Sequence, residues 1–293
     1  MPELPDIVVY QEAIAERVAG TTLERVRLAN PFLLRTVTPP VDSAEGRVVR
    51  GVERLGKRIV LALEGDLFLV VHLMIAGRLH WKEKGAAAPK TIGLAAFDFT
   101  RGTLTLTEAG RKRRASLRVE GSRAALVSLD PGGLDVLAAS FGEFSERLRS
   151  ANHTLKRSLT DPRLFNGIGN AYSDEILFAA RLSPLQLSRN LDEGEAARLH
   201  EACIRVLRTW IERLRQEYAG KFPEKVTAFR KDMAVHGRFG QPCRACGAPI
   251  QRIVYAENEA NYCARCQTGG KLLADRALSR LLREDWPKRL EED

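Results

Sequence analysis

Near the start of the chain stand Pro2 and Glu3. A proline amine and a carboxylate can together act on a carbon electrophile. Met1 precedes a small residue and is normally removed from such a start, which would make the secondary amine of Pro2 the N-terminus. A free α-amino group titrates at roughly 7.7–8.0, so a good fraction of it is neutral and nucleophilic near neutral pH. Amines in that state form Schiff bases, and the adduct of a proline is an iminium cation that withdraws electrons. Taken alone, a Met-Pro start is more often only a processing signal or the start of a helix, so the rest of the chain must support this chemistry.

Four cysteines far along the chain have the spacing of a metal site. Two residues separate Cys243 from Cys246 and Cys263 from Cys266, and sixteen residues lie between the two pairs. Four thiolates in this arrangement form a closed tetrahedral site for one structural Zn²⁺. Two disulfides or free thiols are the alternative, but five cysteines in 293 residues are few for a secreted disulfide framework. The fifth, Cys203, lies in an amphipathic helical pattern and is expected to be a buried thiol.

Three glycine-rich or cationic stretches have the chemistry to bind phosphate. In 166–170 (NGIGN) two glycines permit a tight turn, and a helix that begins at Asn170 would offer unpaired N–H groups to an anion. Lys57 follows Gly56 at the start of a predicted strand, and 110–114 (GRKRR) is a cationic loop after a predicted hairpin. Each feature alone is more often an ordinary capped helix or a solvated surface, so none decides the function by itself.

The elements that must hold the N-terminal residues are predicted by hydrophobic periodicity. A helix over 5–19 would have Asp6 in its first turn, where the helix dipole favours an anion. Antiparallel hairpins are predicted for 58–63 with 67–73 and for 95–99 with 103–107. Several short strands up to about residue 130 favour a β-sandwich.

Beyond residue 130 the pattern changes from strand to helix. Pro131-Gly-Gly is a linker signal, and a Cys-rich block begins at about residue 237. Helices are predicted over 134–149, 155–159, 171–180 and 193–218, and a further one over 271–284. We therefore expect a multidomain α+β protein with flanking helices on its sandwich. Its predicted divisions are a β-sandwich domain at 1–130, a helical domain at 131–236, a zinc ribbon at 237–267 and a helical extension at 268–293.

Charge and composition restrict the function further. The 46 Lys and Arg outnumber the 37 Asp and Glu and give a net charge of +9, which suits a nucleic-acid partner. No apolar run approaches the ~20 residues of a membrane helix, and the first residues lack a signal-peptide pattern. We expect a monomer with no membrane association that works in the cytoplasm, at the nucleoid in a bacterium.

The order of these motifs resembles that of one known family. Pro-Glu-Leu-Pro-Asp at 2–6, Lys57 after a glycine, His72-Leu-Met-Ile-Ala-Gly77, the 167–170 turn and the four-Cys ribbon follow one another along roughly residues 1–267. The formamidopyrimidine-DNA glycosylase / endonuclease VIII family of base-excision repair enzymes has this pattern. The resemblance implies a helix–two-turn–helix domain, one structural Zn²⁺ and the activities of a bifunctional DNA glycosylase and abasic-site lyase. It also implies damaged double-stranded DNA as partner.

The resemblance assigns catalytic roles to four residues of this chain. Pro2 would attack C1′ of a damaged nucleoside, expel the base and hold the sugar as an iminium adduct. Glu3 would give the proton that helps to open the sugar ring, and Asp6, where relatives commonly carry Glu, would support it. Lys57 would contact the phosphate at the lesion and assist β-elimination. An amine, a nearby carboxylate and a lysine also form a plausible acid–base set from their chemistry alone, and the base must leave the stack to be reached.

The DNA contacts that the resemblance implies are matched less closely. Asn170 and Lys156 would bind backbone phosphates. The wedge that fills the gap of the extruded base is usually methionine; alignment puts Ile75 there, with Met74 beside it, so either residue remains possible. Arg111 is the best match to an intercalating arginine.

One position departs from the family in charge. Five residues before the third cysteine, where relatives carry an arginine, this chain has Asn258 between two glutamates. We predict a weaker grip on the phosphate at the lesion and impaired δ-elimination; unchanged affinity and products in an Asn258→Arg variant would refute this. Residues 219–235 look too short and too charged for the lesion-capping loop of the 8-oxoguanine branch, so the base preference stays open.

Several functions remain to be weighed. A catalytically impaired DNA-damage-binding protein on the same scaffold is the main alternative, and Asn258 motivates it. A zinc-ribbon transcription or interaction protein would leave Pro2 unused, and a small-molecule enzyme would need neither the ribbon nor the positive charge. The presence of Pro2, Glu3 and Lys57 together favours the glycosylase and lyase.

Overall fold

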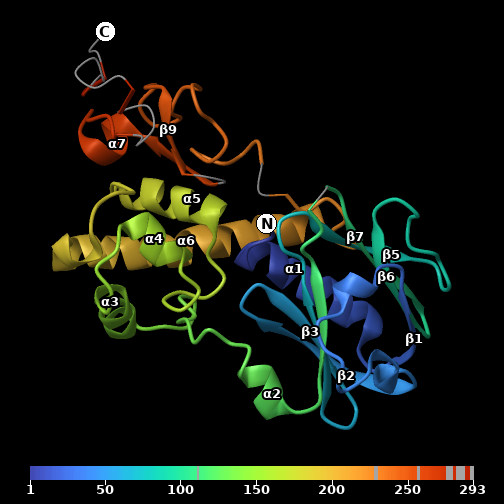
Figure 1. Ribbon diagram of the computed structural model, residues 1–293. Coiled ribbons are helices and arrows are strands. Elements are labelled where there is room, and N and C mark those ends of the chain that lie inside the picture. The colour runs from blue at the N-terminus through green and yellow to red at the C-terminus, as the bar shows by residue number, and fades with distance from the viewer. Residues whose placement is uncertain (111, 228–229, 256–257, 275–279, 282–287, 291–293) are drawn as a thin grey trace. The chain divides into compact units, whose positions relative to one another are not determined.

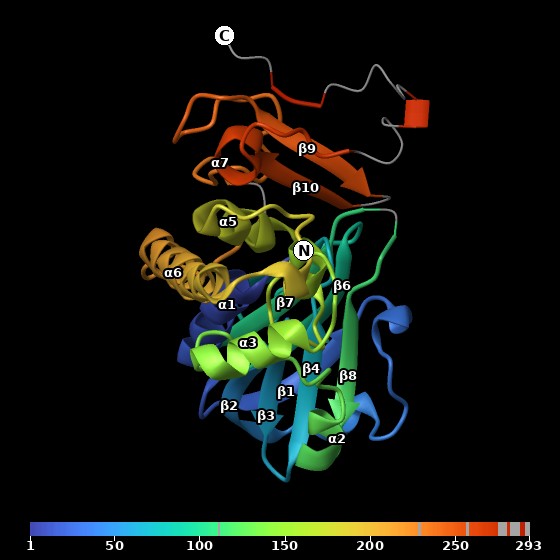
Figure 2. The same ribbon diagram turned by 90° about the vertical axis from the view of Figure 1, so that its left-hand side faces the viewer.

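The computed structural model of the chain describes residues 1–110, 112–227, 230–255, 258–274, 280–281 and 288–290 (Figures 1 and 2). Its internal contacts divide the chain into two compact units. Unit 1 comprises Met1–Pro131 and Trp210–Ala228, and unit 2 comprises Gly132–Thr209 and Phe229–Asp293. The boundary passes through the long helix α6 (Glu193–Glu217).

Unit 1 is built on eight antiparallel strands in the order β5-β7-β6-β1-β2-β3-β4-β8. Only two residue pairs, Thr22 with Val48 and Leu23 with Arg47, join β1 to β2, so the sheet divides into two halves of four strands. The strands are β1 (Thr22–Leu28), β2 (Arg47–Leu55), β3 (Arg58–Leu63), β4 (Leu67–His72), β5 (Gly77–Lys82), β6 (Gly93–Phe99), β7 (Gly102–Glu108) and β8 (Ser116–Glu120). Both predicted hairpins, β3–β4 and β6–β7, are confirmed.

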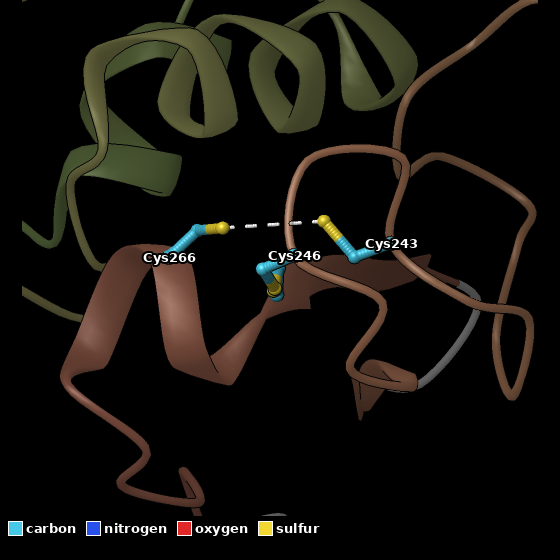
Figure 3. Close-up of side chains that lie close together, drawn as sticks. Cys243, Cys246 and Cys266 are labelled. Atoms are coloured by element: carbon cyan, nitrogen blue, oxygen red, sulfur yellow. Dashed lines mark hydrogen bonds between the residues drawn. The ribbon is translucent and has the colours of Figure 1, made fainter.

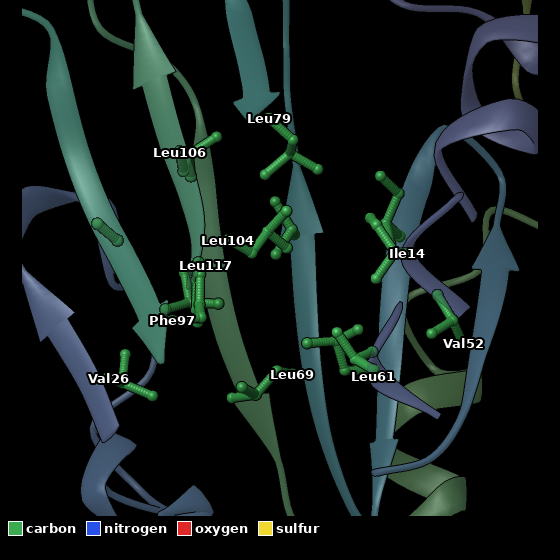
Figure 4. Close-up of a cluster of buried hydrophobic side chains, with 14 of the residues drawn as sticks. Ile14, Val26, Val52, Leu61, Leu69, Leu79, Phe97, Leu104, Leu106 and Leu117 are labelled. Atoms are coloured by element: carbon green, nitrogen blue, oxygen red, sulfur yellow. The ribbon is translucent and has the colours of Figure 1, made fainter. Parts of the chain in front are cut away.

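The core of unit 1 lies between these two halves. Leu61 and Leu69 of one half and Phe97 and Leu104 of the other belong to one buried cluster (Figure 4). Alternation of apolar residues along antiparallel strands turns one face of each half inward, which is the arrangement of a sandwich. The predicted β-sandwich is therefore confirmed.

Short helices complete unit 1. The predicted N-terminal helix is confirmed as α1 (Leu4–Val18), which packs on β2 and buries Ile14 in the core. The unit also contains α2 (Arg123–Val127), the 3₁₀ turns η1 (Pro31–Leu33) and η2 (Val41–Ala44), and the last part of α6.

The charged segment after α6 is also anchored in unit 1. Val226 is 1 % exposed within the core cluster, and the ring of Phe222 lies 5.9 Å from that of Tyr10. Val226 by its burial and Phe222 by its packing against the core thus hold this charged segment in unit 1.

Unit 2 contains the helices predicted after the linker, with one error. Its elements are α3 (Phe141–Arg149), α4 (Leu155–Thr160), α5 (Asn170–Ala180), η3 (Ser188–Asn190), the first part of α6, β9 (Ile250–Tyr255), β10 (Asn258–Cys263) and α7 (Ala264–Thr268). The prediction of helix from residue 134 is wrong for 134–140. Ser140 caps α3 reciprocally with Glu143, because each side chain accepts the other's backbone N–H. Leu134 instead forms a bridge with Phe165.

Most of the helix predicted over 271–284 lies outside the described residues. Among the helices that are described, none combines the length and the apolar character needed to cross a lipid bilayer.

Candidate active site

The N-terminal end of α1 fixes the first candidate catalytic residues. Pro2 is buried, Glu3 is 2 % exposed and Asp6 is fully buried. The backbone N–H of Glu3 donates to Oδ2 of Asp6 at 2.9 Å, so the carboxylate in the first turn holds the residue before the helix. Pro5 in that turn has a backbone angle that already suits a helix. The three residues predicted here are thus brought together.

The N-terminal amine lies among charged groups of unit 1. Burial lowers the pKa of the Met1 amine below its ordinary value. Glu3 and Asp6 raise this pKa, and Arg78 and Lys57 lower it. The net effect is a lowered pKa, so a larger share of the amine is neutral at a given pH.

Lys57 occupies the turn between β2 and β3. Gly56 before it has a φ of 62°, which a glycine adopts without strain and which lets this two-residue turn close. The side chain of Lys57 is half-buried and its charge acts on the Met1 amine and on His72. The role of Lys57 beside Pro2 stays a prediction; its charge acts on the amine of the neighbouring Met1.

The loop between β4 and β5 carries the two candidate wedge residues. The N–H of Met74 donates to Nδ1 of His72 at 3.0 Å, and the N–H of Gly77 donates to the Leu73 carbonyl at 2.9 Å. A Cβ on Gly77 would lie 2.3 Å from that carbonyl oxygen, so only glycine closes the loop. Met74 is half-buried with a φ of 51°, while Ile75 is 55 % exposed. Of the two, Ile75 has the exposure that a wedge requires.

His72, which the sequence shows only as part of a motif, has a defined protonation state in the structure. Burial lowers its pKa to about 4, with contributions from the charges of Arg58 and Lys57. The ring is therefore neutral near neutral pH, which agrees with its Nδ1 accepting the N–H of Met74. Arg111, the predicted intercalating residue, lies outside the described residues.

In unit 2, α5 begins at Asn170 as predicted. Gly169 is its N-cap, and Gly167 has a φ of 83° in the preceding turn. Lys156 of α4 donates from Nζ to the Asn170 carbonyl and to Oδ1 of Asp174, both at 2.6 Å. The Lys156 side chain is only 12 % exposed, so its ammonium group joins α4 to the first turn of α5.

A buried polar network, which the sequence patterns did not predict, surrounds α5. Asp174 is 1 % exposed, and its Oδ2 lies 2.8 Å from Nδ1 of His236 and 3.4 Å from Nδ2 of Asn261 in β10. The neighbouring carboxylate of Glu175 accepts three backbone N–H groups, from residues 234, 235 and 236, at 2.7–3.0 Å. The signal was two adjacent acids in an otherwise apolar stretch of α5, which only buried partners could satisfy.

The four predicted zinc ligands lie together in the ribbon; Figure 3 labels three of them, Cys243, Cys246 and Cys266. All four sulfur atoms are within 4.8 Å of one another; Cys243 to Cys266 is 4.0 Å and Cys246 to Cys263 is 3.4 Å. Tetrahedral Zn²⁺ with Zn–S bonds of about 2.3 Å requires S···S distances of about 3.8 Å. The residues therefore fit one structural zinc, as predicted.

The rest of the ribbon also follows the prediction. β9 and β10 form the hairpin between the two cysteine pairs, in a register that pairs Tyr255 with Asn258 at its tip.

The fifth cysteine, Cys203, is fully buried in α6. Burial raises the pKa of its thiol, as expected for a packing residue.

Comparison with known protein families identifies all three regions. Residues 1–120 match the formamidopyrimidine-DNA glycosylase N-terminal domain, and 133–219 match the H2TH domain of the same enzyme. Residues 240–269 match a zinc finger found in Fpg and isoleucyl-tRNA synthetase (IleRS).

Curated relatives and solved structures agree with these matches. A formamidopyrimidine-DNA glycosylase of Thermus thermophilus is 36% identical over 279 residues, which cover 92% of this chain and 100% of the relative. That of Heliobacterium modesticaldum is 32% identical over 292 residues, covering 91% and 100%. The crystal structure of MutM (Fpg) from Thermus thermophilus has a TM-score of 0.76 at 34% identity, covering 91% of this chain and 98% of that one.

A Lactococcus lactis Fpg in complex with DNA containing an abasic site has a TM-score of 0.79 at 23% identity, covering 91% of this chain and 99% of that one, and supports the fold alone. The identity to the curated relatives, over their whole length, decides the family. The chain belongs to the formamidopyrimidine-DNA glycosylase family.

Proposed function

We propose that Pro2, once Met1 is removed, is the nucleophile of this base-excision DNA glycosylase and abasic-site lyase. The observation that carries this proposal is the charge environment of the N-terminal amine. Burial lowers the pKa of the Met1 amine, and two nearby cations add to this effect against two carboxylates. Removal of Met1 would move the free amine by one residue, to Pro2, which is itself buried, and a neutral amine is the form that attacks carbon.

The proposed reaction begins at C1′ of a damaged nucleoside in DNA. The Pro2 nitrogen bonds to C1′ and loses its proton, while the bond from C1′ to the base breaks and the base leaves with the bonding electrons and takes up a proton. The C1′–O4′ bond then breaks, O4′ receives a proton from Glu3, and the nitrogen lone pair forms the iminium. Loss of a proton from C2′ gives an enamine, whose electrons expel the 3′ phosphate and cut the strand.

The remaining residues of unit 1 have supporting roles in this proposal. Asp6 holds the backbone of Glu3 through its N–H, so Glu3 keeps a fixed position beside the nucleophile. Lys57 binds the phosphate at the lesion and assists the elimination steps. Ile75 is the better candidate for the wedge because it is more exposed than Met74.

DNA contacts are also proposed for unit 2 and for the loop after β7. Asn170 and the first turn of α5 bind a backbone phosphate, as helix N-termini do. Lys156 acts on the same phosphate mainly through α5, since its ammonium group already binds the Asn170 carbonyl. We keep Arg111 as the intercalating arginine and Asn258 as a weakened phosphate contact.

The relatives bear on the partner and on the alternative function. Solved Fpg structures carry lesion-containing or abasic-site DNA, and we assign damaged double-stranded DNA to this chain. No contact among the described residues favours a catalytically impaired binder. We further propose a cytoplasmic monomer whose working divisions are 1–130, 131–236, 237–267 and 268–293.

The test is reductive trapping on DNA with an abasic site and, in parallel, on DNA with an oxidised base. A variant with an added residue that stays attached before Pro2 has no free amine there and should trap nothing. Glu3→Gln should lose roughly 10²–10⁴-fold in base removal, yet should still trap a preformed abasic site, whose sugar ring opens by itself. An exposed-lysine control, Lys84→Met, should behave as wild type. Trapping by the blocked variant at the wild-type rate would reject Pro2.

A further inference from the structure

Asn261, in β10 of the ribbon, is buried between two carboxylates that belong to different elements. The residue is 1 % exposed. Its Nδ2 donates to Oε1 of Glu259 at 3.0 Å and to Oδ2 of Asp174 in α5 at 3.4 Å. Its Oδ1 has no hydrogen-bond partner among the residues that the structure describes. Because an unmatched buried polar atom costs free energy, the contribution of this side chain lies in the two bonds of its Nδ2.

The carboxylate of Asp174 receives donors from three other parts of unit 2. Lys156 of α4 donates to its Oδ1 at 2.6 Å, and Nδ1 of His236, just before the ribbon, lies 2.8 Å from its Oδ2. Asn261 of β10 shares Oδ2 with the histidine. An ionised carboxylate only accepts hydrogen bonds, and donors in different directions fix its plane. The orientation of the Asp174 carboxylate therefore depends on the ribbon as well as on α4.

Lys156 carries this restraint to the phosphate contact proposed at the start of α5. Its Nζ also donates to the Asn170 carbonyl at 2.6 Å, and its side chain is 12 % exposed. The position of Nζ between its two acceptors sets the first turn of α5 against α4. A hydrogen-bonded chain thus runs from Asn261 through Asp174 and Lys156 to Asn170, all within unit 2.

In the other direction the chain extends towards the end of the ribbon hairpin. Glu259 follows Asn258, which pairs with Tyr255 at the tip. Nη1 of Arg252 in β9 lies 3.7 Å from Oε2 of Glu259, and Arg252 is directly opposite Asn261 in the two strands. The two parts of unit 2 that we assign to DNA, the α5 turn and the hairpin tip, are therefore joined through one amide group.

We propose that Asn261 is a positioning residue for DNA binding: its Nδ2 bridges Asp174 and Glu259, and so couples the ribbon to the α5 turn that binds a backbone phosphate. This inference rests on the phosphate contact proposed for Asn170. Buried hydrogen bonds in a chain polarise one another, so the loss of one donor weakens the bonds beyond it. Without the amide, the Asp174 carboxylate loses its link to β10, and Lys156 holds the first turn of α5 less firmly.

The test measures which phosphates of the DNA the protein binds. The zinc-loaded full chain is titrated onto a duplex with a tetrahydrofuran abasic-site analogue, which lacks the C1′ hydroxyl and cannot form a Schiff base. One phosphate at a time is replaced by an uncharged methylphosphonate, and fluorescence anisotropy gives the Kd of each duplex. Asn170→Ala identifies the α5 phosphate as the position where this replacement weakens binding of wild type but no longer weakens that of the variant.

Asn261→Leu roughly keeps the side-chain volume and removes the donor. At the α5 phosphate alone, the methylphosphonate effect should shrink towards that of Asn170→Ala. The slope of log Kd against log salt should become shallower by up to about 0.9, the value of one phosphate. Asn261→Ala, which adds no bulk, should give the same scan, and Asn261→Gln, which keeps an amide donor, should restore part of the contact. Gln251→Ala is the control in β9, where the side chain donates to the Pro249 carbonyl, and should give the wild-type scan.

The outcomes separate the inference from the function on which it rests. If Asn170→Ala changes the methylphosphonate effect at no position, the phosphate contact of the α5 turn fails. If Asn170→Ala loses one phosphate while Asn261→Leu and Asn261→Ala keep the wild-type scan, the role of Asn261 fails alone. An affinity lowered equally for every duplex, with the wild-type salt slope, would also overturn it, because a general loss of stability does not single out one phosphate. All scans use protein with one bound zinc per chain.

Discussion

Two pairs of buried carboxylates, Glu3 and Asp6 in unit 1 and Asp174 and Glu175 in unit 2, have opposite uses. The first pair lies at the start of α1 and the second in the middle of α5, and all four residues are less than a tenth exposed. In unit 2 the carboxylates are matched by a lysine, a histidine and three backbone N–H groups. In unit 1 they face an amine whose pKa burial and two cations lower.

Burial of an acid is therefore not by itself a sign of catalysis. A carboxylate that is fully matched by donors stabilises the fold around it, as Asp174 does for α4, α5 and β10. A carboxylate beside an amine with opposing cations instead sets a protonation equilibrium. Changes in unit 2 should therefore alter stability and DNA affinity, whereas changes in unit 1 should alter the rate and its pH dependence.

The largest effect should follow removal of zinc. Structural zinc contributes about 10–16 kcal/mol of apparent binding free energy in small zinc domains, so Cys246→Ser or a strong chelator should unfold the ribbon. DNA affinity should then fall steeply, while the core of unit 1 should retain its circular dichroism and its thermal transition. Cys203→Ser, at the buried cysteine of α6, is the control and should retain one bound zinc per chain. Loss of zinc without loss of DNA binding would contradict the claim that changes in unit 2 alter DNA affinity.

The next effect should come from the buried network of unit 2. Asp174→Ala leaves Lys156 and His236 without their carboxylate, and breaking a buried pair in this way costs about 3–5 kcal/mol. Urea unfolding should show this loss, and Glu146→Ala, at an exposed position of α3, should show almost none. At saturating DNA the cleavage rate of the folded fraction should change little. A changed pH profile of cleavage in Asp174→Ala would contradict the separation of roles.

A smaller effect, and one that depends on pH, should come from His72. Its pKa is about 4 in the folded protein against 6.5 in a free chain, so the unfolded state takes up a proton first as the pH falls. This contribution to stability is complete above pH 6.5 and is lost between there and about pH 4, by at most about 3 kcal/mol. In His72→Asn, whose side-chain oxygen can still accept the Met74 N–H, the acid loss should shrink. His153→Asn serves as the control, and an unchanged acid loss in His72→Asn would refute the assignment.

The sequence predicted most elements of this fold because their signals are local. Alternation in 103–107 and the glycine turns gave the hairpins, and the cysteine spacing gave the ribbon. The helix predicted from residue 134 failed because Leu134 bonds to a distant segment at Phe165, which no local pattern records. The anchoring of Phe222 and Val226 was missed for the same reason.

The residues of the site were likewise predictable only where they are neighbours in sequence. Pro2, Glu3 and Asp6 are neighbours in sequence, so their proximity was predictable. The role of His236 was not found, because its contact with Asp174 joins residues that are 62 positions apart along the chain.

The most direct test of the account is to locate the trapped adduct. Wild-type protein is reduced with borohydride on abasic-site DNA, the nucleic acid and protein are digested, and the modified peptide is sequenced by mass spectrometry. The account predicts a peptide that begins at Pro2 and carries the reduced sugar remnant on its N-terminal nitrogen. A remnant found instead on the ε-amine of Lys57 or Lys156, with an unmodified N-terminus, would contradict it.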